Sequence, residues 1–204
     1  YEEPDLMKDT GTMLGIHGVY THRWRLNDEI TGFKEVFVEN GINVLRVDMR
    51  YAFDNNMQYE SNGTGDLKGE KHFFVDTRAV VGYDFPYKQK HLFTPYAGVG
   101  YWVLKDHDGR KLSTTGHSSY NREQEYVYIP LGVDYVQKLD KGLSVSLNLE
   151  YDYLIKGTNK TYADGLAFVG WDSKTYLFAD NATHNQQSGH GYRGSVKVAK
   201  EVGQ

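Results

Sequence analysis

The feature that most constrains the fold of this chain is a strict alternation of apolar and polar side chains. In the segment GLSVSLNLEYDYLI, residues 142–155, the odd positions from 143 to 153 carry Leu, Val or Tyr, and the even positions between them carry Ser, Asn, Glu or Asp. Successive side chains of a β-strand point to opposite faces, so the segment predicts a long strand with one apolar and one polar face. Such a strand either buries its apolar face in a protein core or exposes it to lipid.

The same alternation recurs along the chain. It predicts seven strands, at residues 12–24, 43–54, 72–85, 92–104, 126–137, 142–155 and 191–202. An eighth strand is predicted at 31–39, because Asn40-Gly41 is a strong hairpin signal that would join it to the strand beginning at Ile42. If 31–39 is instead a helix or a loop, the eighth strand is missing. The expected fold class is all-β, an antiparallel up-and-down transmembrane β-barrel with eight strands.

The connections between these strands sort by length within one domain, residues 1–204, whose first ten residues form an N-terminal extension. Long loops are expected at 55–70, 105–122 and 156–189. Short turns are expected at 40–41, 86–91 and 138–142, with both termini on the short-turn side. Long loops at one end, short turns at the other and an even strand count are typical of outer-membrane barrels.

The polar face of the predicted strands carries arginines and carboxylates whose charges nearly cancel, with small residues between them. Arginine pairs with carboxylates in a bidentate geometry that suits a packed interior, and an eight-stranded barrel is just wide enough to be filled by side chains. We therefore predict an ion-pair network in the lumen, made of Arg46, Asp48, Arg50, Asp76, Arg78, Asp134, Glu150, Asp152, Arg193 and Lys197.

Aromatic residues gather near both ends of the apolar face. Those near the long-loop end are Trp24, Tyr51, Phe53, Phe73, Tyr101, Tyr151, Tyr153 and Tyr192. Those near the short-turn end are Phe85, Phe93 and Tyr135. Two aromatic belts around an aliphatic band match the two interfaces of a bilayer, and strands of about 11 to 14 residues can span its hydrocarbon layer. The alternative is a soluble lipocalin-like carrier of a small apolar ligand, with Leu147, Val133 and Val75 around that ligand.

The strand TPYAGVGYWVL, residues 94–104, resembles the P-Y-x-G-x-G-Y strand of small eight-stranded outer-membrane proteins of the OmpA-like type. The strands RVDMRYAF and VVGYDF also resemble that superfamily. The resemblance implies a bacterial outer membrane, with a lipid bilayer and lipopolysaccharide as partners. The start at Tyr1 fits a mature exported protein. The ending KEVGQ departs from the terminal aromatic of such proteins, which implies a trimmed C-terminus or an approximate assignment.

Composition excludes several classes of function. The chain has no cysteine, so disulfides and thiolate metal sites are excluded, and a net charge of −4 gives no indication of nucleic acid as a partner. No run of 18 apolar residues exists, so the sequence predicts no transmembrane helix. No histidine cluster has metal-ligand spacing, and the DHDG segment at 106–109 lacks the later carboxylates of a calcium loop. We expect neither a metal nor a cofactor.

Catalysis is the less favoured alternative. Small barrels that modify lipid A as hydrolases or acyltransferases use serine, histidine and an acid near the membrane surface, and the candidates here are His17, His22, His117, Ser118, Ser119 and His190. The sequence has no nucleophile elbow, and His17 is on the polar face of the first strand, where a satisfied interior histidine is the simpler interpretation. We therefore expect a non-catalytic protein.

The connection 156–189 is the remaining informative segment because it is long and rich in aromatic residues. Its candidate binding residues are Tyr162, Phe168, Trp171, Tyr176 and Phe178. One interpretation is a β-hairpin that extends the barrel wall, and the other is a binding surface for a protein or host partner, since exposed Tyr and Trp are favoured anchors. The two are compatible. The expected roles are envelope structure, adhesion or partner binding.

Overall fold

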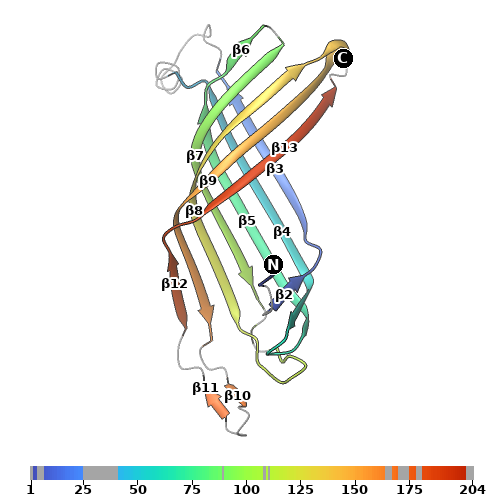
Figure 1. The fold of residues 1–204 in the computed structure, drawn as a ribbon, viewed down its shortest axis with the longest axis vertical. Helices are drawn as coiled ribbons and strands as arrows, with labels where there is room; N and C mark the ends of the chain where they lie inside the picture. Colours follow the sequence, from blue (N-terminus) through green and yellow to red (C-terminus); the bar gives the residue numbers. More distant parts are fainter. Residues whose placement is uncertain are drawn as a thin grey trace.

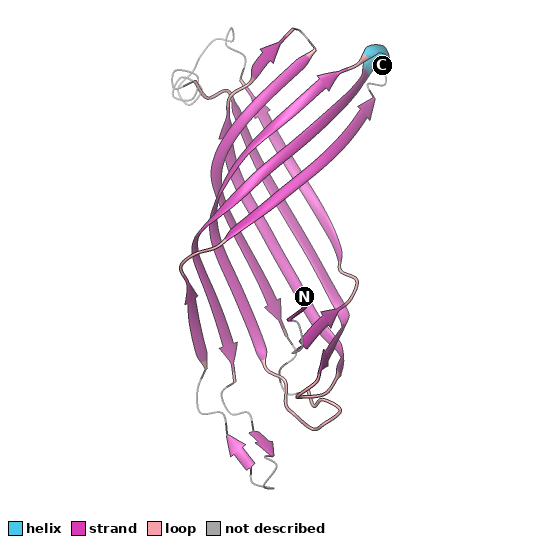
Figure 2. Cartoon of the chain, in the orientation of Figure 1, coloured by secondary structure: helices cyan, strands magenta, loops and turns pink. Residues whose placement is uncertain are grey.

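The chain folds almost entirely into β-strands (Figure 2). The computed structural model describes residues 2–3, 7–24, 41–88, 90–107, 109, 111–163, 167–169, 175–177 and 181–200. Within these ranges the only helix is the short 3-10 turn η1 (Asp140–Gly142). In the part of the chain that the structure describes, no helix is long and apolar enough to cross a membrane. The expected all-β class is confirmed.

Seven long strands form one antiparallel sheet. They are β3 (Leu14–Arg23), β4 (Val44–Ser61), β5 (Leu67–Gly82), β7 (His91–Asp106), β8 (Asn121–Lys138), β9 (Leu143–Tyr162) and β13 (His190–Lys200). Each of them pairs with the next in this order, so the neighbours in sequence are also the neighbours in the sheet. Figure 1 shows the sheet curled into a half-barrel. All seven strands predicted from the alternation are confirmed.

Shorter strands lengthen this wall at one end, where β2 and β12 lie; we call it the extended end. β2 (Met7–Thr10) continues the path of β3 along β4, and β1 (Glu2–Glu3) pairs with β2. β12 (Ala182–Gln186) pairs with β9 in the same register as β13, so the two act as one strand interrupted at 187–189. At the other end β6 (Phe85–Tyr87) pairs with β7. β10 (Ala167–Val169) and β11 (Thr175–Leu177) form a separate hairpin.

The strand predicted at 31–39, with its hairpin to the strand beginning at Ile42, lies outside the described residues, as do all of residues 25–40. In the part of the chain that the structure describes, β4 already has both edges occupied. Its residues 44–53 pair with β3 on one side and with β5 on the other, which leaves no edge for a further strand. Among the described residues, β3 and β13 each pair on one side only, and they run in the same direction. The described sheet is therefore open between these two strands.

Two expectations about loops and termini need correction. Residues 55–70 are not a loop, because β4 runs to Ser61 and β5 begins at Leu67, with Gly65 at a φ of 75° in the turn between them. Much of 156–189 is strand, since β9 runs to Tyr162 and pairs with β12, whereas 107–120 is a loop as predicted. The described ends of the chain lie at opposite ends of the sheet, because seven strands are an odd number (Figure 1).

The polar face of the sheet is buried and the apolar face is exposed, which is the reverse of the arrangement in a soluble protein. Met49 on β4 is 55% exposed, whereas its neighbour Asp48 is 4% exposed. Likewise Leu149 on β9 is 54% exposed and Glu150 only 5%. Apolar side chains therefore cover the outer face, and charged side chains fill the inner face. The lipocalin-like placement is wrong, because Leu147, Val133 and Val75 lie on the outer face.

Aromatic side chains form clusters on the outer face at both ends, with one exception. Tyr51 packs against Phe53 and Phe73 at the end near β2, with ring centroids 6.0 and 6.4 Å apart. At the opposite end the Phe93 and Tyr135 rings are 4.8 Å apart. Trp24 was expected at the long-loop end and is not there. It is buried at the opposite end, where its backbone N–H donates to the Asn43 carbonyl.

Glycines on the inner face make room for two tyrosine rings. A Cβ atom added to Gly132 would overlap the Tyr96 ring, and one added to Gly100 would overlap the Tyr128 ring. Both tyrosines are buried. The small residues between the charges of the polar face are therefore required by close packing across strands.

We expect Gly132→Ala to destabilise the fold by about 1–3 kcal/mol, because the new methyl group must displace the Tyr96 ring. The matched control is Gly18→Ala, on the outer face of β3, where a Cβ would meet no atom within 4 Å. That variant should change the stability by less than about 1 kcal/mol. The free energy of unfolding, measured by urea titration with circular dichroism, tests both. Equal effects of the two variants would contradict the packing argument.

Candidate functional site

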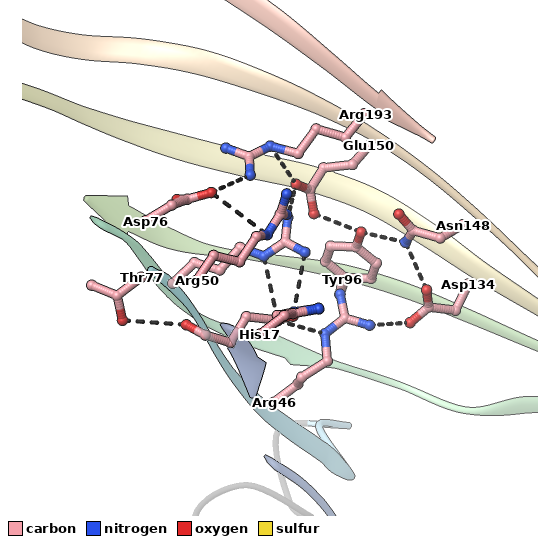
Figure 3. Close-up of polar contacts among 12 residues, drawn as sticks. His17, Arg46, Arg50, Asp76, Thr77, Tyr96, Asp134, Asn148, Glu150 and Arg193 are labelled. Carbon is pink, nitrogen blue, oxygen red and sulfur yellow. Dashed lines mark hydrogen bonds and ion pairs between the residues drawn. The ribbon is translucent and has the colours of Figure 1, made fainter. Parts of the chain in front are cut away.

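A network of charged and polar side chains crosses the interior of the half-barrel and joins β4, β5, β7, β8, β9 and β13 (Figure 3). Its members occupy the inner phase of the alternation, so strand pairing places them at neighbouring levels. For example, Asp48 lies opposite Arg78, and Glu150 lies opposite Arg193. The network is therefore positioned by the register of the sheet.

Glu150 lies at the centre of the network. Its Oε1 pairs with Arg78 Nη1 and lies 3.4 Å from Arg193 Nε. Its Oε2 accepts a hydrogen bond of 2.7 Å from the Tyr96 hydroxyl. One carboxylate thus holds two arginines from β5 and β13 and a tyrosine from β7, so it connects strands that are not neighbours in the sheet.

Arg193 connects the network to β13, the last strand of the sheet. Its Nη1 donates to Asp76 Oδ2 at 2.5 Å, and its Nε donates to Asp152 Oδ2 at 2.5 Å. Its Nη2 donates to the Tyr128 hydroxyl at 2.9 Å, and that hydroxyl donates to Asp76 Oδ1 at 2.6 Å. Charge-assisted bonds of this kind are about twice as strong as neutral ones, so β13 is fixed at its inner face as well as by its backbone pairing.

Arg46 forms the other end of the network. Its Nη1 donates to Asp134 Oδ2 at 2.5 Å, and its Nε lies 3.2 Å from Asp48 Oδ2. Its guanidinium carbon lies 4.4 Å from the centre of the Tyr96 ring, a cation–π distance. Asn148 Nδ2 donates both to the Tyr96 hydroxyl and to Asp134 Oδ1, at 2.7 Å each. Tyr96 is therefore shared by both ends.

The structure brings together nine of the ten predicted lumen residues. The tenth is in the inner phase of its strand but does not join the network. Lys197 is exposed on β13, and within the described residues it has no ion pair. Arg50 is the most weakly held, with its Nε 3.9 Å from Asp76 Oδ2. His17 faces the interior as predicted, with Nε2 3.5 Å from Asp48 Oδ1.

Sequence reasoning missed three members of the network. Tyr96, Tyr128 and Asn148 lie in the inner phase of their strands and were not assigned to the lumen. Two features of the sequence indicate that the tyrosines point inward. They have the same strand phase as the lumen charges, and Gly100 and Gly132 lie under the two rings. The predictions for aromatic residues in the strands cover the outer face alone, so they do not identify the two tyrosines that point inward.

The outer face becomes ionic beyond the aromatic residues of the extended end. Lys160 Nζ on β9 donates to Glu123 Oε1 at 2.8 Å and to Glu125 Oε2 at 2.9 Å on β8, and Lys105 Nζ lies 2.6 Å from Glu123 Oε2. Hydrogen bonds from Lys105 and Lys160 lower the pKa of Glu123, and those from Lys160 and Tyr101 lower the pKa of Glu125. We call these four charged residues the outer ladder.

The serine and histidine candidates for catalysis fall into two sets. His117, Ser118 and Ser119 lie together in the loop 111–120 and line one cavity with Glu70 and Asp106. The others are apart: His17 points to the inner face but is half exposed, His22 stacks edge-on against Trp24, and His190 lies near Tyr151. In the loop 111–120, His117 Nδ1 pairs with the Thr115 hydroxyl at 2.8 Å, and the Ser119 hydroxyl donates to the Lys111 carbonyl at 3.2 Å. In the described part of the chain no group of three or more acidic or histidine side chains is arranged to hold a metal ion.

The candidate binding residues of 156–189 are only partly described. Tyr162 is exposed at the end of β9, and Phe168 lies opposite Tyr176 in the β10–β11 hairpin. Trp171 and Phe178 lie outside the described residues. The interpretation of this segment as an extension of the wall is confirmed where β9 pairs with β12.

We expect Glu150→Gln to lower the free energy of unfolding by about 3–5 kcal/mol, because the buried Arg78 and Arg193 lose their shared counter-charge. Glu125→Gln on the outer ladder makes the same chemical change at a solvent-facing pair and should cost less than about 1 kcal/mol. Urea titration of the two variants measures the difference. A Glu150→Gln protein as stable as the parent would mean that the network fills space without holding the strands.

No family model, no characterised protein and no solved structure matched this chain. The resemblance of its strands to small OmpA-like barrels therefore stays a prediction. Function has to be inferred from the burial and charge of the two faces.

Proposed function

We propose that this chain forms the β-barrel wall of a non-catalytic bacterial outer-membrane protein, with its functional surface at the extended end. One observation carries the proposal: large apolar side chains are exposed on the outer face of six of the seven long strands, whereas the carboxylates of the inner face, such as Asp48, Asp76 and Glu150, are buried. A bilayer is the solvent in which both faces are satisfied, because lipid covers the apolar face and the paired charges are enclosed.

The size of the exposed apolar surface argues against water as its surroundings. Large apolar side chains exposed on the outer face occur on β3, β4, β7, β8, β9 and β13, among them Ile16, Met49, Val99 and Val196. Soluble monomers rarely expose a contiguous apolar patch larger than a few hundred Å². A patch that follows the sheet around its curved outer face fits contact with lipid.

The apolar band is close in height to the lipid-facing band of outer-membrane barrels. Phe93 and Tyr101 mark its two edges on β7 and lie eight residues apart. That spacing is about 27 Å along a strand, or about 20 Å along the axis of a barrel at a tilt of about 40°. Outer-membrane barrels have an apolar band about 25 Å tall between two aromatic girdles. Beyond Tyr101 the outer ladder begins, as expected where a strand leaves the lipid.

A closed barrel would need at least one more strand between β3 and β13. An antiparallel barrel closes with an even number of strands, and β3 and β13 run in the same direction. A strand that runs opposite to both would pair with each of them and complete the wall. Its outward side chains would be apolar and its inward ones polar.

The extended end is where a partner would be met. β8, β9 and β12 continue past the apolar band, and the β10–β11 hairpin lies beyond them (Figure 1). Lipopolysaccharide head groups would surround the outer ladder, and the hairpin with Phe168 and Tyr176 would reach further outward. This surface suits envelope structure, adhesion or binding of a protein or host partner.

We expect Leu147→Arg to block membrane insertion, because an arginine on the lipid face of a barrel costs up to about 2–4 kcal/mol, most near mid-depth. The assay is expression with a signal peptide, isolation of the outer-membrane fraction and electrophoresis with and without boiling. The parent chain should be in that fraction with a heat-shifted band, and the Leu147→Arg variant should lose both.

Leu112→Arg is the matched control. Leu112 lies in the loop 111–120 and is 66% exposed, more than Leu147 at 38%, but the proposal places it in water. It should insert like the parent chain. In a soluble protein both residues would be surface leucines and both variants would be tolerated, so equal behaviour of the two would refute the lipid-facing orientation.

A further inference from the structure

A cavity of about 250 Å³ lies at the extended end, inside the wall and under the loop 111–120. Its apolar and aromatic lining is formed by Met7, Tyr59, Leu67 and Tyr120, and the loop adds polar side chains from Ser113, His117, Ser118 and Ser119. Neither the interior ion-pair network nor the outer ladder contributes to it. The cavity is large enough for a molecule of roughly eight non-hydrogen atoms, at about 30 Å³ for each water-sized unit.

The loop that covers the cavity is held in place by hydrogen bonds to the β4–β5 hairpin. Thr114 N donates to the Asp66 carbonyl, and Asp66 N donates to Thr114 Oγ1, both at 2.9 Å. Thr115 Oγ1 donates to the Thr64 carbonyl at 2.7 Å, and Lys111 Nζ donates to the Gly69 carbonyl at 2.5 Å. Loop and hairpin therefore form one structure, and the cavity between them is built into the fold.

Glu70 is the side chain that gives this cavity a chemical character. It is 3% exposed and lines the cavity from β5, yet its Oε2 accepts no hydrogen bond from any residue that the structure describes. Among these residues its ion-pair partner is His72, whose Nε2 lies 3.6 Å from that oxygen, beyond hydrogen-bonding distance. A buried carboxylate oxygen without a donor is costly unless a donor arrives with a ligand.

The arginine in the cavity is already engaged. Arg122 donates from Nε and Nη2 to Asp106 Oδ2, at 3.0 and 2.9 Å, and its Nη2 lies 3.9 Å from Asp9 Oδ2. Burial raises the pKa of Asp9, and the neighbouring Glu70 carboxylate acts in the same direction. Three carboxylates, Asp9, Glu70 and Asp106, thus lie close together, and the contacts of Arg122 are with Asp106 and Asp9.

We propose that this cavity binds a small organic ammonium ion, which donates to Glu70 Oε2 and packs its apolar part against Tyr59 and Tyr120. Aromatic faces also favour a nearby cation. A bare metal ion is a poorer fit, because within the described residues no three acidic or histidine side chains are arranged as ligands. The inference goes beyond the proposed barrel and does not depend on a bilayer, so it can fail while the barrel stands.

The experiment is isothermal titration calorimetry of the full chain in detergent micelles, with titrations into empty micelles subtracted. The probes are cyclohexylamine, cyclohexanol and cyclohexanecarboxylate at neutral pH, which share one ring and differ in charge. We expect the ammonium to bind at least about tenfold more tightly than the alcohol, and the carboxylate to give no binding signal. Equal affinity for all three, tighter binding of the carboxylate, or no binding of the ammonium would overturn the proposal.

Three variants locate the site. Glu70→Gln should weaken cyclohexylammonium binding at least about tenfold, whereas Glu125→Gln on the outer ladder should bind like the parent chain. Met7→Trp should fill the cavity and abolish binding without touching a carboxylate, which keeps the test valid if Glu70→Gln folds poorly. Binding that persists in Met7→Trp, or that is lost equally in Glu125→Gln, would place the ammonium outside this cavity and contradict the assignment.

Discussion

The buried pairing of Glu150 with Arg78 and Arg193 is the interaction on which the rest of the structure depends. Ionised groups can be enclosed only when each has a counter-charge and hydrogen bonds, since an unpaired buried charge costs several kcal/mol. The inner face meets that condition by alternating arginine and carboxylate across neighbouring strands. Once the charges are inside, the period of two places the apolar side chains that alternate with them outside. The unusual outer face is therefore a consequence of the network within.

The same network explains the glycines and the tyrosines. Long arginine side chains need hydrogen-bond partners that reach into the middle of the interior, and the hydroxyls of Tyr96 and Tyr128 reach there because Gly132 and Gly100 leave space under their rings. Each ring replaces several small side chains as filling. The groups that fill the interior also link β5, β7, β8, β9 and β13 to one another, so filling the interior also makes it rigid.

The features that sequence reasoning predicted correctly are local, and those it missed are not. Alternation within one segment identified all seven long strands and the faces of nine lumen residues, because the period of a strand is set residue by residue. The Asn40-Gly41 signal is also local, whereas the edges of β4 are paired with β3 and β5, a long-range arrangement that a two-residue signal does not reveal. The strand extensions at 55–70 were missed because the register shift after Asp54 breaks the alternation. Lys197 has the right phase but lies on the strand at the open edge, where exposure depends on a neighbour that no single segment reveals.

At the extended end, a buried carboxylate is a clearer indication of a binding site than exposed aromatic residues are. Aromatic residues in 156–189 had made that connection the first candidate, yet in a barrel an aromatic near an end can serve the bilayer interface as well as a partner. Glu70 has no such structural use. It lies beyond the apolar band, under a loop fixed to the hairpin of β4 and β5, and its Oε2 accepts no hydrogen bond from the described residues. Asp48 and Asp152 in the lumen also keep one oxygen without a hydrogen bond, but each of them pairs with an arginine, whereas among the described residues Glu70 has only His72 at 3.6 Å and lines a cavity. A ligand that supplies a donor is the simplest physical reason for this arrangement.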